Sequence, residues 1–361
     1  MLFSRRRKRT IYVLHWQAVS LVANNKLTNR SDTTDAMKGL FSHAHGIYAL
    51  DSNYIRPMMA AIHLIVEQNE VAFVDTGVNA SLPRVLAALD HLQLRVADVK
   101  YVLLTHVHLD HAGGAGAMMQ SFPNAMLVVH PRGARHMVDP GKLVEGATAV
   151  YGAEQTRNMY GEIVPVDASR VISAEHGHSL NLAGRQIDCL DTPGHARHHL
   201  CFRDHRSQAI FSGDIFGISL RELDVTTPDG RVRELTYPAT TPTQFDPEAM
   251  HHSVQMLMDL RPPYVYCTHF GETHDVSAKG ESLHRLVRQY IEIALRHRDA
   301  GSRRQELVEI DLRKLLIDEA RAMGSHLSDE DFNHLIDKDM HLNAQGLVYW
   351  LDQGAPGMPG A

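Results

Sequence analysis

A cluster of metal-ligand side chains directly behind a strand-like segment most constrains how this chain can fold. The mainly apolar run from Val99 to Leu104 has the length of a strand that is buried on both faces. Four ligand-type residues follow within six positions: His106, His108, Asp110 and His111. Because side chains alternate along a strand, His106 and His108 point to the same side and can bind one metal ion. The chain must then turn, so Asp110 and His111 can bind a second ion. The spacing therefore predicts a metal site at the end of a buried strand.

The remaining ligands are expected at the ends of later strands, because four side chains cannot complete the coordination of two ions. Three candidates follow strand-like segments in order along the chain: His195, Asp214 and His269. Each alone would be a weak signal, since a single histidine after a strand is more often an ordinary core or surface group. Their shared position behind strands makes them candidate ligands as a set. Gly113 and Gly114, just after the first cluster, are predicted to relieve crowding where the backbone folds back towards the metals.

Other polar residues near these segments are predicted to support the site or to be unrelated to it. Asp75, at the end of an earlier strand-like run, is expected to accept a hydrogen bond from the second ring nitrogen of a ligating histidine. His198 and His199 stay undecided, because they could reach the mouth of the site or begin the next strand. Most of the 25 histidines are read as ordinary groups. These include the closely spaced pairs His43/His45, His176/His178 and His251/His252.

The pattern of apolar residues predicts an α/β fold. Strand-like runs at 61–66 and 71–74 are expected to form a hairpin, and a helix is expected over 81–94 with Ser81 as its N-cap. Further strands are expected at 99–104, 125–129, 186–190, 199–202, 209–212 and 264–268. The alternation of strands and helices in the first half is typical of layered α/β proteins. Two long segments, 133–164 and 217–245, are expected to be loops that shape the pocket wall.

Helical periodicity dominates after Asp275. Helices are expected over 283–295 and 307–323, with a third from Ser328 and a last one capped by Asn343. We therefore divide the chain into a loosely ordered extension over 1–36, a catalytic domain over 37–275 and a helical segment over 276–361. The helical segment would pack on the catalytic domain or form a homodimer contact. An arginine-rich start with an interrupted apolar stretch favours an N-terminal extension over a signal peptide.

Composition excludes several classes of function. A formal net charge of -6 offers no basic footprint, so we expect no nucleic-acid partner. The three cysteines are scattered, which argues against a disulfide framework and for a reducing, cytoplasmic compartment. No apolar run approaches the roughly 20 residues that span a bilayer, so no membrane segment is expected.

In these motifs the sequence resembles the metallo-β-lactamase superfamily, whose pattern is HxHxDH followed by a His, an Asp and a His. The resemblance covers residues 46–275. It is nearer, at 54–60, 128–134 and 192–199, to a branch of uncharacterised or promiscuous metal-dependent hydrolases. It implies a four-layer αββα sandwich with the metals at one edge, to which the C-terminal helices would be appended.

The resemblance also implies a role for each candidate ligand. The first ion would be held by three histidines, namely His106, His108 and His195. The second ion would be held by Asp110, His111 and His269. Asp214 would bridge the two ions, and Asp110 would be the catalytic proton shuttle. Zinc is the default metal for such a set, although iron or manganese also suits these ligands.

The expected activity is hydrolysis of a small-molecule ester, thioester, lactone or phosphodiester. Two divalent ions about 3.5–4 Å apart would share a water and lower its pKa towards 7, and the resulting hydroxide would attack the substrate. Asp214 stands where a true β-lactamase of this fold generally has Cys or Ser. Gly217 stands where acyl-homoserine lactonases carry a tyrosine. Two alternatives stay open: a mononuclear-iron oxygenase of the persulfide dioxygenase type, and a lactonase-like ligand-binding relative without turnover.

Overall fold

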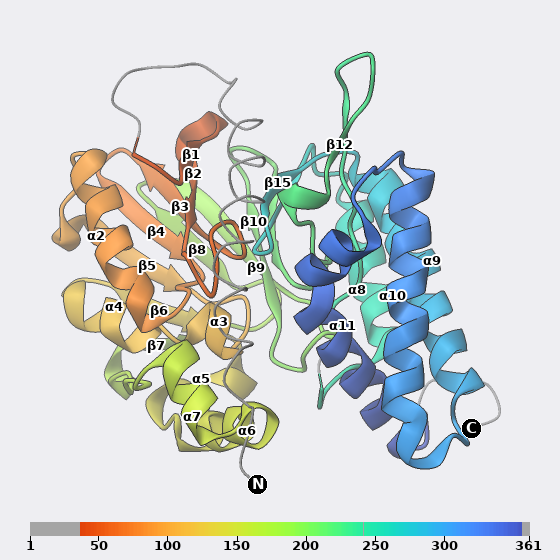
Figure 1. Cartoon of the computed structure of the whole chain (residues 1–361). Helices are drawn as coiled ribbons and strands as arrows, with labels where there is room; N and C mark the ends of the chain where they lie inside the picture. The colour runs from red at the N-terminus through yellow and green to blue at the C-terminus, as the bar shows by residue number, and fades with distance from the viewer. Residues whose placement is uncertain (1–36, 241, 356–361) are drawn as a thin grey trace, which may run out of the picture. The chain divides into compact units, whose positions relative to one another are not determined.

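Two β-sheets packed face to face form the centre of the fold (Figure 1). The computed structural model describes residues 37–240 and 242–355. The expected extension over residues 1–36 therefore lies outside the described residues. The described helices and strands lie in one compact unit, Gly39–Ala361.

The first sheet has seven strands that are neighbours in the order of the sequence. They are β1 (Leu40–Ser42), β2 (Ile47–Asp51), β3 (Ala61–Glu67), β4 (Glu70–Val74), β5 (Val99–Leu103), β6 (Met126–Val129) and β7 (Val171–Ser173). Strands β1 to β4 are antiparallel, which confirms the expected hairpin of β3 and β4. Strands β4 to β7 are parallel, so each connection between them must cross over the sheet. Helix α2 (Leu82–His91) makes the first crossover, and Ser81 is its N-cap residue as predicted.

The second sheet has six strands in the order β15-β14-β11-β10-β9-β8. They are β8 (Ser179–Leu182), β9 (Arg185–Asp191), β10 (Leu200–Asp204), β11 (Ile210–Gly213), β14 (Val265–Cys267) and β15 (Gly271–Thr273). Strands β9 and β11 are both antiparallel to β10, and β14 is parallel to β11. The strands β9, β11 and β14 therefore run in one direction, and their carboxyl ends meet at the same edge of the sheet.

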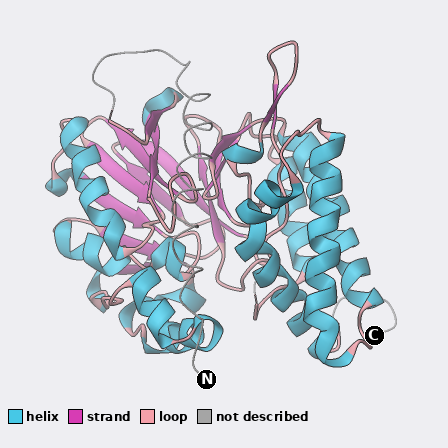
Figure 2. Ribbon diagram, in the orientation of Figure 1, coloured by secondary structure: helices cyan, strands magenta, loops and turns pink. Residues whose placement is uncertain are grey.

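Apolar side chains from both sheets fill the space between them. Val74 and Leu103 of the first sheet pack in one buried cluster with Phe202, Phe211 and Tyr266 of the second. Helices cover the outer faces. Phe122, at the end of α4 (Ala115–Ser121), stacks on Phe73 of β4 with ring centroids 5.5 Å apart. Figure 2 shows helices on both outer sides of the paired sheets, which confirms the αββα order of layers.

The C-terminal helices cover the outer face of the second sheet together with α8 (Pro247–Asp259). They are α9 (Val276–Arg296), α10 (Arg304–Ala322) and α11 (Asp329–Asp352). The expected break at Asn343 is wrong, because α11 is one continuous helix through that residue. The Asn343 side chain is buried and bonds to a neighbouring loop instead of capping a helix. The proposed domain boundary at residue 275 stays a prediction.

The two expected pocket-wall loops differ from each other. The segment 133–164 is largely helical rather than a loop, because it contains most of α5 (Pro131–Val138), α6 (Gly141–Tyr151) and α7 (Ala153–Tyr160). The segment 217–245 is mainly irregular, with only the short hairpin of β12 (Val225–Thr226) and β13 (Val232–Arg233). The short helices are α3 (Leu109–Ala112) and the 3-10 turns Ala44–Gly46, Asn79–Ser81, Val96–Asp98, Ala168–Arg170, Arg221–Leu223 and Gly301–Arg303. Among the described residues, no helix has the length and apolar character needed to cross a bilayer.

Candidate metal centre

The seven predicted ligands come together at one edge of the sandwich. Each follows the carboxyl end of a strand: β5 leads to the HxHxDH segment, and β9, β11 and β14 lead to His195, Asp214 and His269. Asp110 and His111 lie in α3, the single helical turn behind that segment. Because β9, β11 and β14 run in one direction, residues far apart in sequence meet at one place. Within the described residues, the groups able to hold a metal ion draw on these seven side chains alone.

The first group is a triangle of histidine nitrogens. His106 Nε2 lies 2.8 Å from His108 Nδ1, and His195 Nε2 lies 3.1 Å from the same His108 nitrogen. Ligand atoms about 2.0–2.1 Å from a tetrahedral zinc ion lie roughly 3.3 Å apart. The three nitrogens therefore have the spacing of donors that share one ion.

The second group joins Asp110 Oδ2 to two histidine nitrogens. The oxygen lies 3.6 Å from His269 Nε2 and 3.9 Å from His111 Nε2. Asp214 lies between the two groups: its Oδ1 is 3.3 Å from His111 Nε2, and its Oδ2 is 3.4 Å from His195 Nε2. One carboxylate therefore faces both groups with different oxygens, as a bridging ligand would.

The donor atoms are aimed inward by hydrogen bonds on their far sides. His195 Nδ1 bonds to the carbonyl of Ala239 at 2.9 Å, and His269 Nδ1 bonds to the carbonyl of Met59 at 2.7 Å. These bonds place the proton on Nδ1 and leave the Nε2 lone pair pointing into the cluster. His111 Nε2 and Asp214 Oδ1 are buried and face each other at 3.3 Å, but neither makes a hydrogen bond. Buried polar atoms normally have partners, so these two fit a site that a cation completes.

Asp75 holds the cluster from behind, as predicted. Its carboxylate accepts a hydrogen bond from His111 Nδ1 at 2.8 Å. The hydroxyls of Thr105 and Thr268 also donate to it, at 2.9 Å and 2.8 Å. Each threonine directly precedes a candidate ligand, and Thr105 Oγ1 also lies 3.1 Å from His106 Nδ1. Neither threonine was predicted to belong to the site, although the repeated Thr-His pair at two strand ends was a usable signal.

Electrostatics in the cluster follow from burial and from the mixture of carboxylates and imidazoles. Burial lowers the pKa of His106, and the surrounding histidines lower it further. Burial also acts to lower the pKa of His269, but the carboxylates of Asp214 and Asp110 outweigh it and raise that pKa to about 9. Burial acts to raise the pKa of Asp214, whereas His111 and His269 bring it well below its usual range. Without a metal, protonated His269 therefore balances the negative charge of the carboxylates. A bound cation would balance the same charge.

His199 supports the site, a role that the sequence left undecided. It is buried, its Nδ1 lies 2.9 Å from Thr192 Oγ1, and its Nε2 accepts the backbone N–H of Asp214 at 3.2 Å. It therefore orients the bridging carboxylate through the backbone. The adjacent His198 is buried near the cluster but bonds only weakly, with Val107 N at 3.5 Å.

Two glycines explain how the site is built and how it differs from lactonases. A side chain on Gly114 would meet the carbonyl oxygens of Thr76 and Val78 at 2.8 Å and 3.0 Å, which confirms the predicted close approach of the backbone. Gly217 has φ +84, and a Cβ there would lie 2.7 Å from the Tyr237 carbonyl oxygen. The fold therefore leaves no room at position 217 for the tyrosine that acyl-homoserine lactonases carry.

Three tyrosines, which we call the tyrosine wall, lie beside the centre: Tyr54, Tyr151 and Tyr160. The rings of Tyr54 and Tyr160 stack with centroids 5.9 Å apart, and their hydroxyls lie 3.0 Å apart. Tyr151 packs against Tyr160 at 6.2 Å. Lys338 of α11, which the sequence analysis did not single out, completes this surface.

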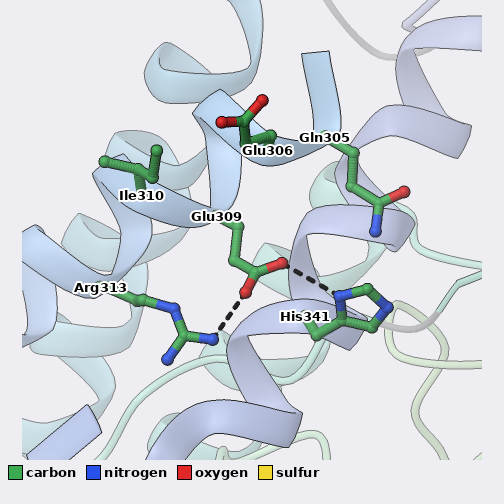
Figure 3. A pocket seen from close by; sticks show the side chains of 6 residues that line it. All are labelled: Gln305, Glu306, Glu309, Ile310, Arg313 and His341. Carbon is green, nitrogen blue, oxygen red and sulfur yellow. Dashed lines mark hydrogen bonds and ion pairs between the residues drawn. The ribbon is translucent and has the colours of Figure 1, made fainter. Parts of the chain in front are cut away.

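A separate hollow of about 330 Å³ lies on α10 and α11 and shares no residue with the centre (Figure 3). Glu309 binds both Arg313 and His341 there, at 2.6 Å and 3.0 Å. Glu309 and Arg313 thus pair with each other, Glu306 pairs with Arg303, and we assign no chemistry to this hollow.

Comparison with known proteins supports the same kind of site. The family model described as the metallo-beta-lactamase superfamily matches residues 55–269, which is more than half of the chain and holds all seven candidate ligands. The chain is 25% identical over 230 residues to the metallo-beta-lactamase fold-containing protein ST1585 of Sulfurisphaera tokodaii, covering 63% of this chain and 78% of that protein. The solved structure of ST1585 superposes with a TM-score of 0.54 at 21% identity, covering 84% of this chain and 99% of that one.

Two further relatives are hydrolases by name. A hydroxyacylglutathione hydrolase of Aeromonas salmonicida is 28% identical over 209 residues, covering 58% of this chain and 60% of the relative. The acyl-coenzyme A thioesterase MBLAC2 of Gallus gallus is 31% identical over 118 residues, covering 31% of this chain and 39% of the relative. In both cases the match spans less than two thirds of the relative's length.

Proposed function

This chain belongs to the metallo-beta-lactamase superfamily, and we propose that it is a hydrolase that uses two divalent metal ions, with zinc as the expected metal. The observation that carries the proposal is the position of Asp214, whose two oxygens face two separate sets of donors. His106, His108 and His195 would hold one ion. Asp110, His111 and His269 would hold the other, and Asp214 would contact both.

Bound divalent ions supply Lewis acidity and activate water at neutral pH. The side chains of this protein then do the rest. The hydrogen bonds from Asp75 and from the Met59 and Ala239 carbonyls keep the imidazoles oriented, so the ligands need not reorganise during turnover.

Asp110 is the group best placed to move a proton. Its side chain is 24% exposed, whereas those of Asp214, His111 and His269 are exposed by 8% or less. Burial acts to raise the pKa of Asp110, but His111 and His269 lower it below its ordinary value, so the carboxylate is charged and can accept a proton. It could then pass that proton to the leaving group as a general acid–base catalyst.

The substrate class that we propose is an acyl compound, with thioesters first among esters, lactones and phosphodiesters. The thioesterase and hydroxyacylglutathione hydrolase names of two relatives support this choice. The blocked position at Gly217 argues against a lactonase that depends on a tyrosine there.

The test combines metal analysis with a substrate panel on the purified protein. We expect about two ions per chain and turnover of at least one thioester. Asp110→Asn keeps a ligand oxygen but removes the base, so it should lower kcat by about a hundredfold or more. The exposed Asp229→Asn is the matched control and should leave activity unchanged.

Full activity in Asp110→Asn would remove its catalytic role. A single iron per chain with oxygen consumption would replace the hydrolase by a mononuclear-iron oxygenase, and absence of any turnover would favour a non-catalytic binding protein.

A further inference from the structure

Lys338 is a cation without an anionic partner among the described residues. Its Nζ lies over the rings of Tyr54 and Tyr151, 5.9 Å and 5.4 Å from their centroids. Its one hydrogen bond runs to Met159 Sδ at 3.5 Å, and a thioether is a weak acceptor. Cation–π contacts fix the position of an ammonium but do not neutralise it. The half-buried Lys338 therefore presents a positive charge at the tyrosine wall that no described carboxylate neutralises by an ion pair.

Helix α11, which carries Lys338, is hydrogen-bonded to the loop 237–240, and this loop is hydrogen-bonded to the candidate ligand His195. Asp339, the next residue, accepts the Tyr237 hydroxyl at 2.7 Å. One turn further on, Asn343 accepts the backbone N–H of Thr240 at 2.7 Å and donates to the Pro238 carbonyl at 3.0 Å. The Ala239 carbonyl, within the same stretch of loop, bonds to His195. The position of α11 is thus tied to the metal centre.

The tyrosine wall also borders the centre from the other side. Burial raises the pKa of Tyr54, Tyr151 and Tyr160, and the nearby carboxylate of Asp110 raises it further. The Met59 carbonyl, in the loop that carries Tyr54, bonds to His269. Burial lowers the pKa of Lys338, while the carboxylates of Asp110 and Asp339 act to raise it, in accord with a position close to the centre.

Asp339 does not act as the counter-ion of Lys338. Its carboxylate is buried and already accepts the Tyr237 hydroxyl, and it forms no ion pair within the described part of the chain. Burial raises its pKa above the ordinary value, while the hydrogen bond from Tyr237 acts to lower it. The charge of Lys338 is therefore free to act on a ligand.

We propose that Lys338 is a specificity-determining residue that binds an anionic group, a carboxylate or a phosphate, on the substrate of the metal centre. The inference rests on the proposed hydrolase function. Apolar atoms between the anion and the reacting acyl group would pack on the faces of the tyrosine wall. A compact ammonium on a flexible stem suits a single anion that approaches from solvent. The C-terminal helices would then select the substrate, while the sheet edge carries the chemistry.

The test compares Lys338→Met with Lys338→Arg on matched thioesters. Acetyl and succinyl thioesters of N-acetylcysteamine differ by a carboxylate on the acyl side, and acetyl phosphopantetheine adds a phosphate on the thiol side. Methionine keeps the apolar stem, so the neutral acetyl substrate should be unaffected. In Lys338→Met, the KM for one anionic substrate should rise by roughly tenfold or more with little change in kcat. In Lys338→Arg, the rise in KM should be smaller. Which anionic substrate responds identifies the group that Lys338 binds.

A second measurement separates failure of this inference from failure of the hydrolase proposal. Calorimetric titration with succinate and with inorganic phosphate requires no turnover. The wild type should bind one of these anions roughly tenfold more tightly than Lys338→Met does. The exposed Lys314→Met on α10 is the control and should bind like the wild type. Equal losses for neutral and anionic substrates in Lys338→Met, or unchanged binding of both anions, would overturn the role of Lys338 even if the protein is a hydrolase.

Discussion

The edge of the sandwich and the C-terminal helical layer contribute to the same site in different ways. At the edge, the ligands follow strand ends, and His111, His195 and His269 are each held by one hydrogen bond to a nearby carboxylate or backbone carbonyl. In the helical layer, Lys338, Asp339 and Asn343 reach the site from a helix that begins 60 residues beyond the last candidate ligand. The comparison suggests that the edge determines the chemistry and the helical layer determines which substrate is accepted. Three changes would sharpen or break this division.

The largest effect is expected where the edge is changed without altering its shape. Asp75→Asn keeps the size of the side chain but removes the carboxylate that holds His111, Thr105 and Thr268. Loss of such a supporting carboxylate typically weakens metal affinity by about 10- to 100-fold. Competition with a chelator measures this directly. Wild-type affinity in Asp75→Asn would show that backbone geometry alone orients His111, and the edge would then be more robust than we infer.

A smaller and different effect is expected in the helical layer. Asn343→Ala leaves the buried Thr240 N–H and Pro238 carbonyl without partners, so the free energy of unfolding should fall by about 2 kcal/mol. Denaturant titration measures the loss, and Gln345→Ala, whose side chain bonds only to His341 on the same helix, is the control. The metal content should stay near the wild-type value while KM for an anionic substrate rises. Loss of metal in Asn343→Ala would contradict the division, because the helical layer would then be needed to form the centre.

The smallest effect concerns the pH dependence of the metal-free protein. The pKa of His269 is about 9 in the fold against an ordinary value of 6.5, because Asp214 and Asp110 outweigh the opposing effect of burial. A raised pKa stabilises the fold fully below about pH 6.5, and this contribution is lost as the pH rises through about 9. Thermal unfolding of metal-free protein should therefore shift to lower temperature between these values. Metal-loaded protein should lack this trend, since a ligating imidazole cannot keep the proton. A flat profile without metal would show that the carboxylates do not act on His269 as described.

Much of the fold was predictable because its strands have simple patterns. The hairpin of β3 and β4, the buried strand β5 and the strands β9, β10, β11 and β14 of the second sheet were predicted within one or two residues of their observed bounds, whereas β8 and β15 were not predicted. The segment 133–164 was taken for a loop, although it forms helices, because its five glycines and Pro140 interrupt the helical period. Asn343 was taken for a helix cap because asparagine is frequent there, and only the buried contacts with Thr240 and Pro238 explain it inside a helix.

The seven candidate ligands were also predictable, since each directly follows a strand and parallel strand ends meet at one edge. Asp75 was predicted for the same reason. Thr105 and Thr268 were missed because a threonine hydroxyl gains a role only from the carboxylate that it meets. His251 was read as an ordinary residue. Its Nδ1 lies 2.7 Å from Nδ1 of His284, and it belongs to none of the metal-holding groups among the described residues.

The amino-acid sequence by itself determined the type of site, because strand periodicity and ligand spacing are local properties of the chain. Tertiary structure alone decided what surrounds it: that Lys338 lies over Tyr54 and Tyr151, and that Gly217 has no space for a side chain. Such contacts join residues more than a hundred positions apart, or depend on the packing of a helix against a loop. No periodicity in the chain encodes them, since they arise only when the hydrophobic layers bring separate elements together.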